Sequence, residues 1–157
     1  MPANVGRARS QGLEIEARMP IGALALRASL NRNWSRVDSL ARPGNQLDGQ
    51  TPLSATVAAD YAPAASPWSA GASLNVQSGA TVRTSEDETV STPTVRNVDA
   101  FALYRYGRRV QLRLALSNLL HPDLLSGSRH EDAAGSVARS QRESQRPSAR
   151  FTVEYVF

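Results

Sequence analysis

Apolar and polar residues alternate along most of this 157-residue chain. In residues 53–61, for example, Leu53, Ala55 and Val57 occupy every second position, and small or polar residues stand between them. Such alternation is typical of a β-strand with one apolar and one polar face. About seven segments follow the pattern: 12–19, 23–38, 53–61, 68–77, 95–106, 110–116 and 150–157. The pattern therefore predicts an all-β, antiparallel protein of about seven meandering strands.

The segment 95–106 alternates less cleanly than the others. If Val98 and Tyr104 lie on its apolar face, then Phe101 and Leu103 fall on the polar face, next to Asp99. A β-bulge in this strand would change that assignment.

The connections between the segments alternate between short and long. The short ones are 20–22, 62–67 and 107–109, and the long ones are 39–50, 79–94 and 121–148. Outer-membrane β-barrels have short periplasmic turns and long extracellular loops. Counting back from the last strand, every short connection falls on one side and every long one on the other. This asymmetry favours a transmembrane β-barrel or a fragment of one.

The composition is compatible with that interpretation. Hydrophobic residues make up 41% of the chain, and its mean hydropathy is -0.36. No window approaches the roughly 18 consecutive apolar residues of a spanning helix, whereas a barrel strand needs only alternation. Aromatic residues gather at the strand ends next to the short connections, where an interfacial girdle is expected. They are Tyr61, Trp68, Tyr104, Tyr106, Tyr155 and Phe157, and Trp34 falls at the opposite end.

Arginine provides every basic side chain, since the sequence contains no lysine, and the formal net charge is +4. Arginine suits the recognition of phosphate. The arginines are scattered and no nucleic-acid-binding motif accompanies them, so we expect no nucleic-acid partner. The absence of cysteine excludes disulfides and thiolate metal sites.

The last segment ends on an aromatic residue, which is unusual for a soluble protein because chain ends tend to be polar. It resembles the closing strand of bacterial outer-membrane β-barrels. This resemblance implies that Phe151, Val153, Tyr155 and Phe157 form a signal read by the barrel-assembly machinery.

Further stretches resemble the C-terminal part of TonB-dependent outer-membrane receptors of the siderophore-receptor type. Residues 4–17 are similar to a descending strand with a Gly-hydrophobic-Glu-hydrophobic core, and residues 47–53 resemble a proline-containing strand entry. Residues 110–120 are similar to the penultimate strand, which ends in an Asn-Leu pair, here Asn118 and Leu119, followed by Asp123. The order and spacing of these motifs are more specific than any one of them.

The resemblance implies a transporter in the outer membrane of a Gram-negative bacterium, importing a scarce ligand such as a ferric siderophore. Residues 1–157 would be the C-terminal part of a 22-stranded, plugged barrel, without the plug, the TonB-contacting segment, the signal peptide and the N-terminal strands. The implied partners are outer-membrane lipid and lipopolysaccharide, the barrel-assembly machinery, the remaining strands and plug, and TonB indirectly through that plug.

Two alternatives remain open at the sequence level. The chain could be a small independent outer-membrane barrel that either pairs with copies of itself or contains a further strand that the alternation does not reveal. It could also be a soluble β-sandwich binding module, whose strands alternate as well but need neither the loop asymmetry nor a terminal Phe.

The candidates for chemistry are weak, and we expect neither an enzyme nor a cofactor. His121 and His130 flank the carboxylates of Asp123, Glu131 and Asp132 without a metal-binding spacing, so we expect a solvated loop there rather than a metal site. Glu14 and Glu16 point the same way on a strand, as in a hydrated barrel wall. No nucleophile-elbow motif occurs. Contact with lipopolysaccharide phosphates or an anionic ligand is expected at Arg139, Arg142 and Arg146, in a flexible loop.

Overall fold

The computed structural model describes residues 7–40 and 44–156, and they form eleven β-strands. The strands are β1 (Ala8–Ile21), β2 (Leu24–Val37), β3 (Leu53–Tyr61), β4 (Trp68–Gln77), β5 (Ala80–Arg83), β6 (Glu88–Thr92), β7 (Val95–Tyr106), β8 (Val110–Ser117), β9 (Asp123–Asp132), β10 (Gly135–Ser144) and β11 (Ser148–Tyr155). Within these residues no helix is long and apolar enough to cross a membrane.

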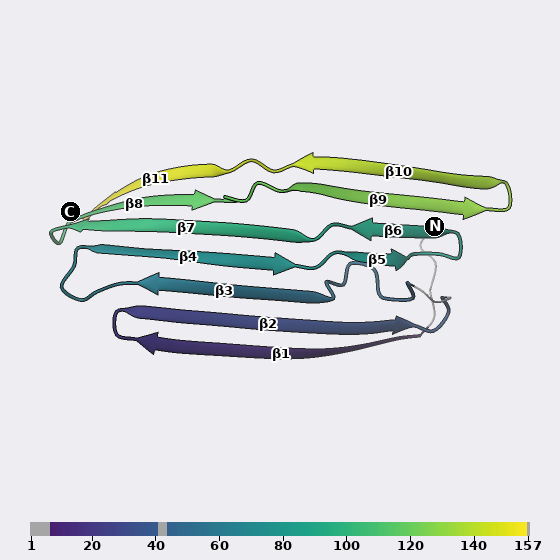
Figure 1. Cartoon of the computed structure of the whole chain (residues 1–157), viewed down its shortest axis with the longest axis horizontal. Coiled ribbons are helices and arrows are strands. Elements are labelled where there is room, and N and C mark those ends of the chain that lie inside the picture. Colours follow the sequence, from purple (N-terminus) through teal and green to yellow (C-terminus); the bar gives the residue numbers. More distant parts are fainter. Residues whose placement is uncertain (1–6, 41–43, 157) are drawn as a thin grey trace.

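Seven strands form one antiparallel sheet in the order β1-β2-β3-β4-β7-β8-β11, and Figure 1 shows them side by side. They correspond to the seven predicted segments, so the all-β antiparallel prediction is confirmed. The bounds of β3, β4 and β7 are those read from the alternation. β1 and β11 are the two edges, and the sheet does not close on itself within the described residues.

The first short connection differs from the prediction. β1 continues through Pro20 and Ile21, and a two-residue turn at Gly22 and Ala23 leads into β2. Gly22 has φ = 60°, as the first central position of a type II′ hairpin turn requires. Pro20 is tolerated inside β1 because that strand lies at the edge of the sheet.

The remaining strands form a second sheet, in the order β10-β9-β6-β5, beyond the strand ends opposite the short turns (Figure 1). The long connections 79–94 and 121–148 are not only loops, since they contain the hairpins β5–β6 and β9–β10, which the sequence pattern did not predict. Most positions on both faces of β9 and β10 are polar, so neither strand shows the apolar stripe by which the sequence reveals a strand.

Residues directly opposite each other in an antiparallel sheet point to the same side. The register therefore defines an apolar face of the seven-stranded sheet, which contains the row Met19, Leu26, Ala59, Ala72, Ala100 and Leu116. The polar face contains the row Glu16, Ser29, Thr56, Asn75 and Asn97. Within residues 7–40 and 44–156 no other layer covers either face.

The buried core is correspondingly small. Among the described apolar residues only Val37, Ala58, Val82 and Leu103 are buried. Val37 and Val82 lie where the end of the first long connection folds back, since the backbone N–H groups of Val37 and Arg83 donate to the carbonyls of Asn45 and Gly44. Two of the four buried residues thus lie at the end of the sheet away from the short turns, and Ala58 and Leu103 lie on the polar face of the sheet.

The pairing of β7 is continuous with β4 from Trp68–Tyr104 to Gln77–Val95. No bulge interrupts it. The assignment of Phe101 and Leu103 to the polar face is therefore confirmed by the register.

Candidate functional site

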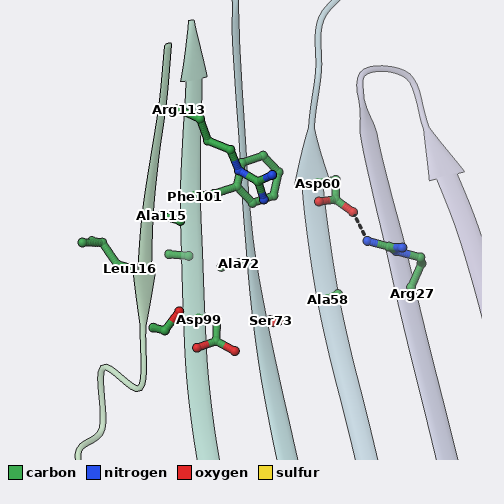
Figure 2. Close-up of a pocket in the computed structure, with 12 residues that line it drawn as sticks. Arg27, Ala58, Asp60, Ala72, Ser73, Asp99, Phe101, Arg113, Ala115 and Leu116 are labelled. Carbon is green, nitrogen blue, oxygen red and sulfur yellow. Dashed lines mark hydrogen bonds and ion pairs between the residues drawn. The ribbon is translucent and has the colours of Figure 1, made fainter. Parts of the chain in front are cut away.

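The polar face of the seven-stranded sheet contains a hollow (Figure 2). It has a volume of about 260 Å³ and is lined by side chains from β2, β3, β4, β7 and β8. Arg27, Ala58 and Ser73 also line a second hollow of about 300 Å³, which extends to Glu16 and Arg18 on β1. The two hollows form one polar surface across the sheet.

An ion pair between neighbouring strands crosses this surface. The guanidinium of Arg27 on β2 donates to the Asp60 carboxylate on β3 (Figure 2). Both side chains are partly exposed, so the pair is a solvated contact of modest strength. It contributes charge of both signs to the hollow.

An aromatic side chain interrupts the polar face beside this pair. Phe101 on β7 lies opposite Gly71 on β4, and the guanidinium of Arg113 on β8 stacks over the Phe101 ring at 5.2 Å (Figure 2). A Cβ atom on Gly71 would lie 2.5 Å from Asp60 Oδ1 and 2.6 Å from Phe101 Cε1. Glycine is therefore favoured here, because a larger residue would force the ring of Phe101 or the carboxylate of Asp60 to move.

Other contacts on the polar face link neighbouring strands. The Thr56 hydroxyl donates to Asn75 Oδ1 at 2.9 Å, and the Gln111 amide donates to Glu154 Oε2 at 3.2 Å. The Oδ1 atoms of Asn31 and Asn97 are shielded from solvent and have no hydrogen-bond partner.

The polar face has the character of a hydrated wall. Glu14 and Glu16 lie on it, opposite Asn31 and Ser29 of β2, as the alternation predicted. Acidic and basic side chains are intermixed: Glu14, Glu16, Asp60, Asp99 and Glu154 lie with Arg18, Arg27, Arg105, Arg113 and Arg150. This arrangement can hold water and polar groups by hydrogen bonds.

The aromatic residues lie on the apolar face at the ends of strands next to the short turns. The rings of Trp68 and Tyr104 contact each other at 4.5 Å between centroids, tilted by 42°. Tyr61, Tyr106 and Tyr155 are exposed on the same face. The predicted girdle is present at these positions, and Trp34 lies at the opposite end of β2.

The predicted arginine cluster does not form one surface. Arg139 and Arg142 lie on opposite faces of β10, because they are three positions apart along a strand whose side chains alternate between its faces. Arg142 is engaged by the carboxylate of Asp123, which the Ser144 hydroxyl also contacts at 2.7 Å. These contacts, the Ser144 hydrogen bond first, hold the pKa of Asp123 below its ordinary value. Arg146 lies between β10 and β11, and its carbonyl accepts from the Asn118 amide.

The histidines and carboxylates of the same segment are dispersed along β9 and its approach. His121 Nδ1 lies 3.2 Å from the Leu119 carbonyl, and His130 Nε2 lies 3.5 Å from Asp132. The backbone N–H of Ala134 lowers the pKa of Asp132. In the described part of the chain no three such side chains come together as metal ligands. The expected solvated loop is instead a solvated hairpin.

Three of the four residues of the closing-strand signal lie on the apolar face. Phe151, Val153 and Tyr155 of β11 are exposed and face the same side as Leu114, Leu112 and Val110 of β8. Phe157 lies outside the described residues. The strand forms the stripe that the alternation predicted, along an edge of the sheet.

Sequence reasoning missed the structural role of Asn118. This residue has φ = 57°, a left-handed conformation that Asn adopts more readily than most residues. Its N–H donates to Asp99 Oδ1 at 2.9 Å, and its amide reaches the Arg146 carbonyl. Asn118 thus turns the chain from β8 toward β9, and the Asn-Leu pair was the signal for it.

Comparison with known proteins assigns the family. Residues 1–119 match the family model described as TonB dependent receptor-like, beta-barrel, which covers well over half of the chain. No curated protein and no solved structure matches the chain significantly. The matched family consists of transporters of the Gram-negative outer membrane and is not a family of enzymes. The matched range, the antiparallel meander and its two contrasting faces agree, and the chain therefore belongs to the TonB-dependent receptor β-barrel family.

Proposed function

We propose that this chain is part of the barrel wall of a transporter that imports a scarce ligand such as a ferric siderophore. The observation that carries the proposal is the pair of contrasting faces on one uncovered sheet. Leu114 on β8 is 41% exposed and Phe151 on β11 is 65% exposed, side by side on the apolar face. Lipid would cover this face, and a hydrated lumen would border the polar face.

The open edges support a larger barrel. In the described part of the chain β1 and β11 each pair with one neighbouring strand only, and a strand edge left open is very costly in lipid. We infer that residues 1–157 form a C-terminal part of the barrel, in which further strands pair with these edges and a plug lies against the polar face. TonB would act on that plug rather than on these strands.

The soluble β-sandwich has no support, because a sandwich needs a second sheet packed on the apolar face, and neither face of the seven-stranded sheet is covered. A small independent barrel would need β1 and β11 to pair, either with each other or with another copy.

The orientation can be tested with single cysteines, since the natural chain has none. Gln46→Cys, Glu86→Cys and Ala134→Cys lie at exposed positions of the three long connections, and Arg108→Cys lies in a short turn. On intact cells an impermeant thiol reagent should label the first three and leave Arg108→Cys unlabelled until the outer membrane is opened. Labelling of Arg108→Cys alone on intact cells would contradict the proposed orientation.

Transport itself requires a separate test. A strain lacking the protein should take up less radiolabelled iron from some ferric siderophores, and uptake should return with the wild-type gene only when TonB is present. If the strain took up every ferric siderophore normally but took up another scarce ligand poorly, the protein would still be a transporter. The proposal that its ligand is a ferric siderophore would then be wrong.

We further propose that Phe151, Val153, Tyr155 and Phe157 are read by the barrel-assembly machinery through strand addition at the exposed edge of β11. Deletion of Phe157 should lower the amount of barrel in the outer membrane, while the inserted molecules resist heat nearly as well as wild type. Normal surface levels combined with a sharply lower melting temperature would instead assign the stripe to packing.

Arg139, Arg142 and Arg146 remain proposed contacts for an anionic ligand or lipopolysaccharide. The fold narrows this proposal, because Asp123 already engages Arg142. Arg139→Gln should therefore weaken ligand uptake more than Arg142→Gln, when each variant is measured in the transport assay above.

A further inference from the structure

Charge is segregated between the two faces of the seven-stranded sheet. The polar face carries both carboxylates and arginines. The apolar face, over all seven strands, carries no carboxylate, and its only charged side chains are Arg9, Arg32, Arg36 and Arg96. A lipid-facing surface should avoid charge in the hydrocarbon, so the position of these arginines is informative.

All four lie at the same end of the sheet, away from the short turns. On β2 the apolar run from Leu24 to Leu30 gives way to Arg32 and Arg36. Arg9 on β1 lies opposite Arg36 on β2, and Arg96, the second residue of β7, lies opposite Val76 on β4. The residues from Leu24 to Arg32 span roughly 26 Å along the strand, close to the apolar height of a barrel wall.

An aromatic side chain marks the same boundary. Trp34 stands between Arg32 and Arg36 on the apolar face, is 47% exposed, and has the Arg32 guanidinium 5.7 Å from its ring. Tryptophan favours the level of the lipid headgroups. The contact with Trp34 also holds the Arg32 side chain near the surface of the sheet, where its donors remain available.

These arginines are accessible for a ligand. The side chains of Arg9, Arg36 and Arg96 are exposed, and Arg32 is half-buried. Arg36 lies 3.5 Å from the exposed carboxylate of Asp38. Because only one of the four arginines has this carboxylate beside it, the arginine band formed by Arg9, Arg32, Arg36 and Arg96 keeps a net positive charge. Arg32 and Arg96 lie within one row of each other across β3 and β4, about 14 Å apart at the usual strand spacing.

We propose that Arg32 and Arg96, supported by Arg9 and Arg36, bind the phosphate groups of lipopolysaccharide at the outer surface of the membrane. Guanidinium groups bind phosphate by bidentate hydrogen bonds. This surface is distinct from the β10 arginines. Its proposed role in binding lipopolysaccharide rests on the proposed orientation, in which the long connections lie outside the cell. Of the anionic lipids, the proposal commits to phosphorylated lipid A because that orientation puts the band in the outer leaflet.

The test uses the whole protein as it occurs in the outer membrane, purified in mild detergent, stripped of lipid and titrated with bisphosphorylated lipid A. Binding is followed by the fluorescence of Trp34. Trp34 and Trp68 are the only tryptophans in the chain, so Trp68→Phe, together with replacement of any tryptophan elsewhere in the protein, makes the fluorescence specific for Trp34. Arg32→Gln/Arg96→Gln should weaken binding about tenfold. Arg18→Gln/Arg105→Gln, which removes the same charge from the polar face, should change it less than twofold.

Arg32→Lys/Arg96→Lys should give intermediate affinity, since it keeps the charge and loses the fork geometry. The single variants Arg32→Gln and Arg96→Gln extend the test if the double variant fails to insert. Lipid A without phosphates should bind as weakly to wild type as the bisphosphorylated form binds to the double variant. Equal weakening in both charge-removal pairs, or equal binding of phosphatidylglycerol and lipid A, would overturn the proposal. The cysteine labelling reports the orientation separately, so a wrong orientation and a wrong lipid site give different results.

Discussion

The seven-stranded sheet and the four-stranded sheet are built from the same antiparallel hairpins, yet their surfaces differ. On the seven-stranded sheet one face is apolar except at the end away from the short turns, and Leu13, Ile15, Phe151 and Val153 are exposed on it. On β9 and β10 large apolar side chains are isolated, as with Leu125 and Val137. The same backbone architecture therefore serves two solvents, and the side-chain alternation decides which one.

The two sheets also differ in how aromatic and charged residues are distributed along their strands. The seven-stranded sheet has aromatic residues at one end and arginines at the other, as a surface that crosses two interfaces requires. The β9–β10 hairpin has no such gradient, and its charged groups pair locally, as Arg142 does with Asp123 and His130 with Asp132. A charge on β9 or β10 is hydrated on either face.

The largest expected effect comes from placing a charge on the apolar face. Leu114→Arg should destabilise the inserted protein by about 2–4 kcal/mol if the residue lies near the membrane midplane. Val137→Arg, at a position 69% exposed on β10, should have little effect. Ala115→Arg, on the polar face of β8, should also be tolerated. The measurement is unfolding in denaturant from lipid vesicles, and equal damage from all three changes would erase the distinction between the sheets.

A smaller effect is expected from adding one methyl group. Gly71→Ala puts a Cβ within 2.6 Å of both Phe101 and Asp60, so at least one side chain must move, at a cost of about 1–3 kcal/mol. The matched change in the second sheet is Gly127→Ala on β9, whose Cβ would meet only the Arg139 carbonyl at 3.4 Å. The same unfolding assay should separate the two variants. If Phe101→Ala did not relieve the defect of Gly71→Ala, the close packing would not be its cause.

The smallest effect concerns pH and is confined to the hairpin. The folded-state pKa of Asp123 is lowered, first by Ser144 and then by Arg142, so its contribution to stability is present above the unfolded pKa, about 3.9. It is lost as the pH falls below that value through the folded pKa. Amide exchange in β9 and β10 should therefore accelerate, beyond its intrinsic pH dependence, between neutral and strongly acidic pH. The backbone amides of β3 and β4 should not show this additional acceleration of exchange at acidic pH.

Asp123→Asn should remove most of the pH dependence at the Asp123 end of the hairpin. Asp132, whose pKa is lowered by the N–H of Ala134, acts in the same direction at the tip. An unchanged pH profile in Asp123→Asn would show that the contacts of this carboxylate do not stabilise the hairpin.

The sequence predicted those strands that have one apolar face, which is the face expected to contact lipid. β3, β4 and β7 were delimited correctly, because one side of each strand is apolar along its length and polar connections bound it. β9 and β10 were missed because they are hydrated on both faces, and a strand pairing polar side chains has no period-two signature in hydrophobicity. The alternation of apolar and polar residues therefore predicted the strands of the seven-stranded sheet and did not predict those of the four-stranded sheet.

The site shows a similar division. The side of the sheet on which Phe101 and Glu16 lie follows from alternation alone. Which residues meet across strands depends on the register, and the six-residue connection between β3 and β4 does not fix it from sequence. The stacking of Arg113 on Phe101 and the need for Gly71 beneath it could therefore not be predicted.

The hairpin β9–β10 has one more consequence. Each strand has ten residues and so spans about 33 Å. It starts where β8 ends and runs away from the short turns (Figure 1). In the proposed orientation the tip at Ala133 and Ala134 is among the first parts of this chain that an antibody, a phage or a protease outside the cell would meet. The barrel wall below shares no packed core with that tip, so replacement or cleavage there should alter what the cell displays and leave the wall intact.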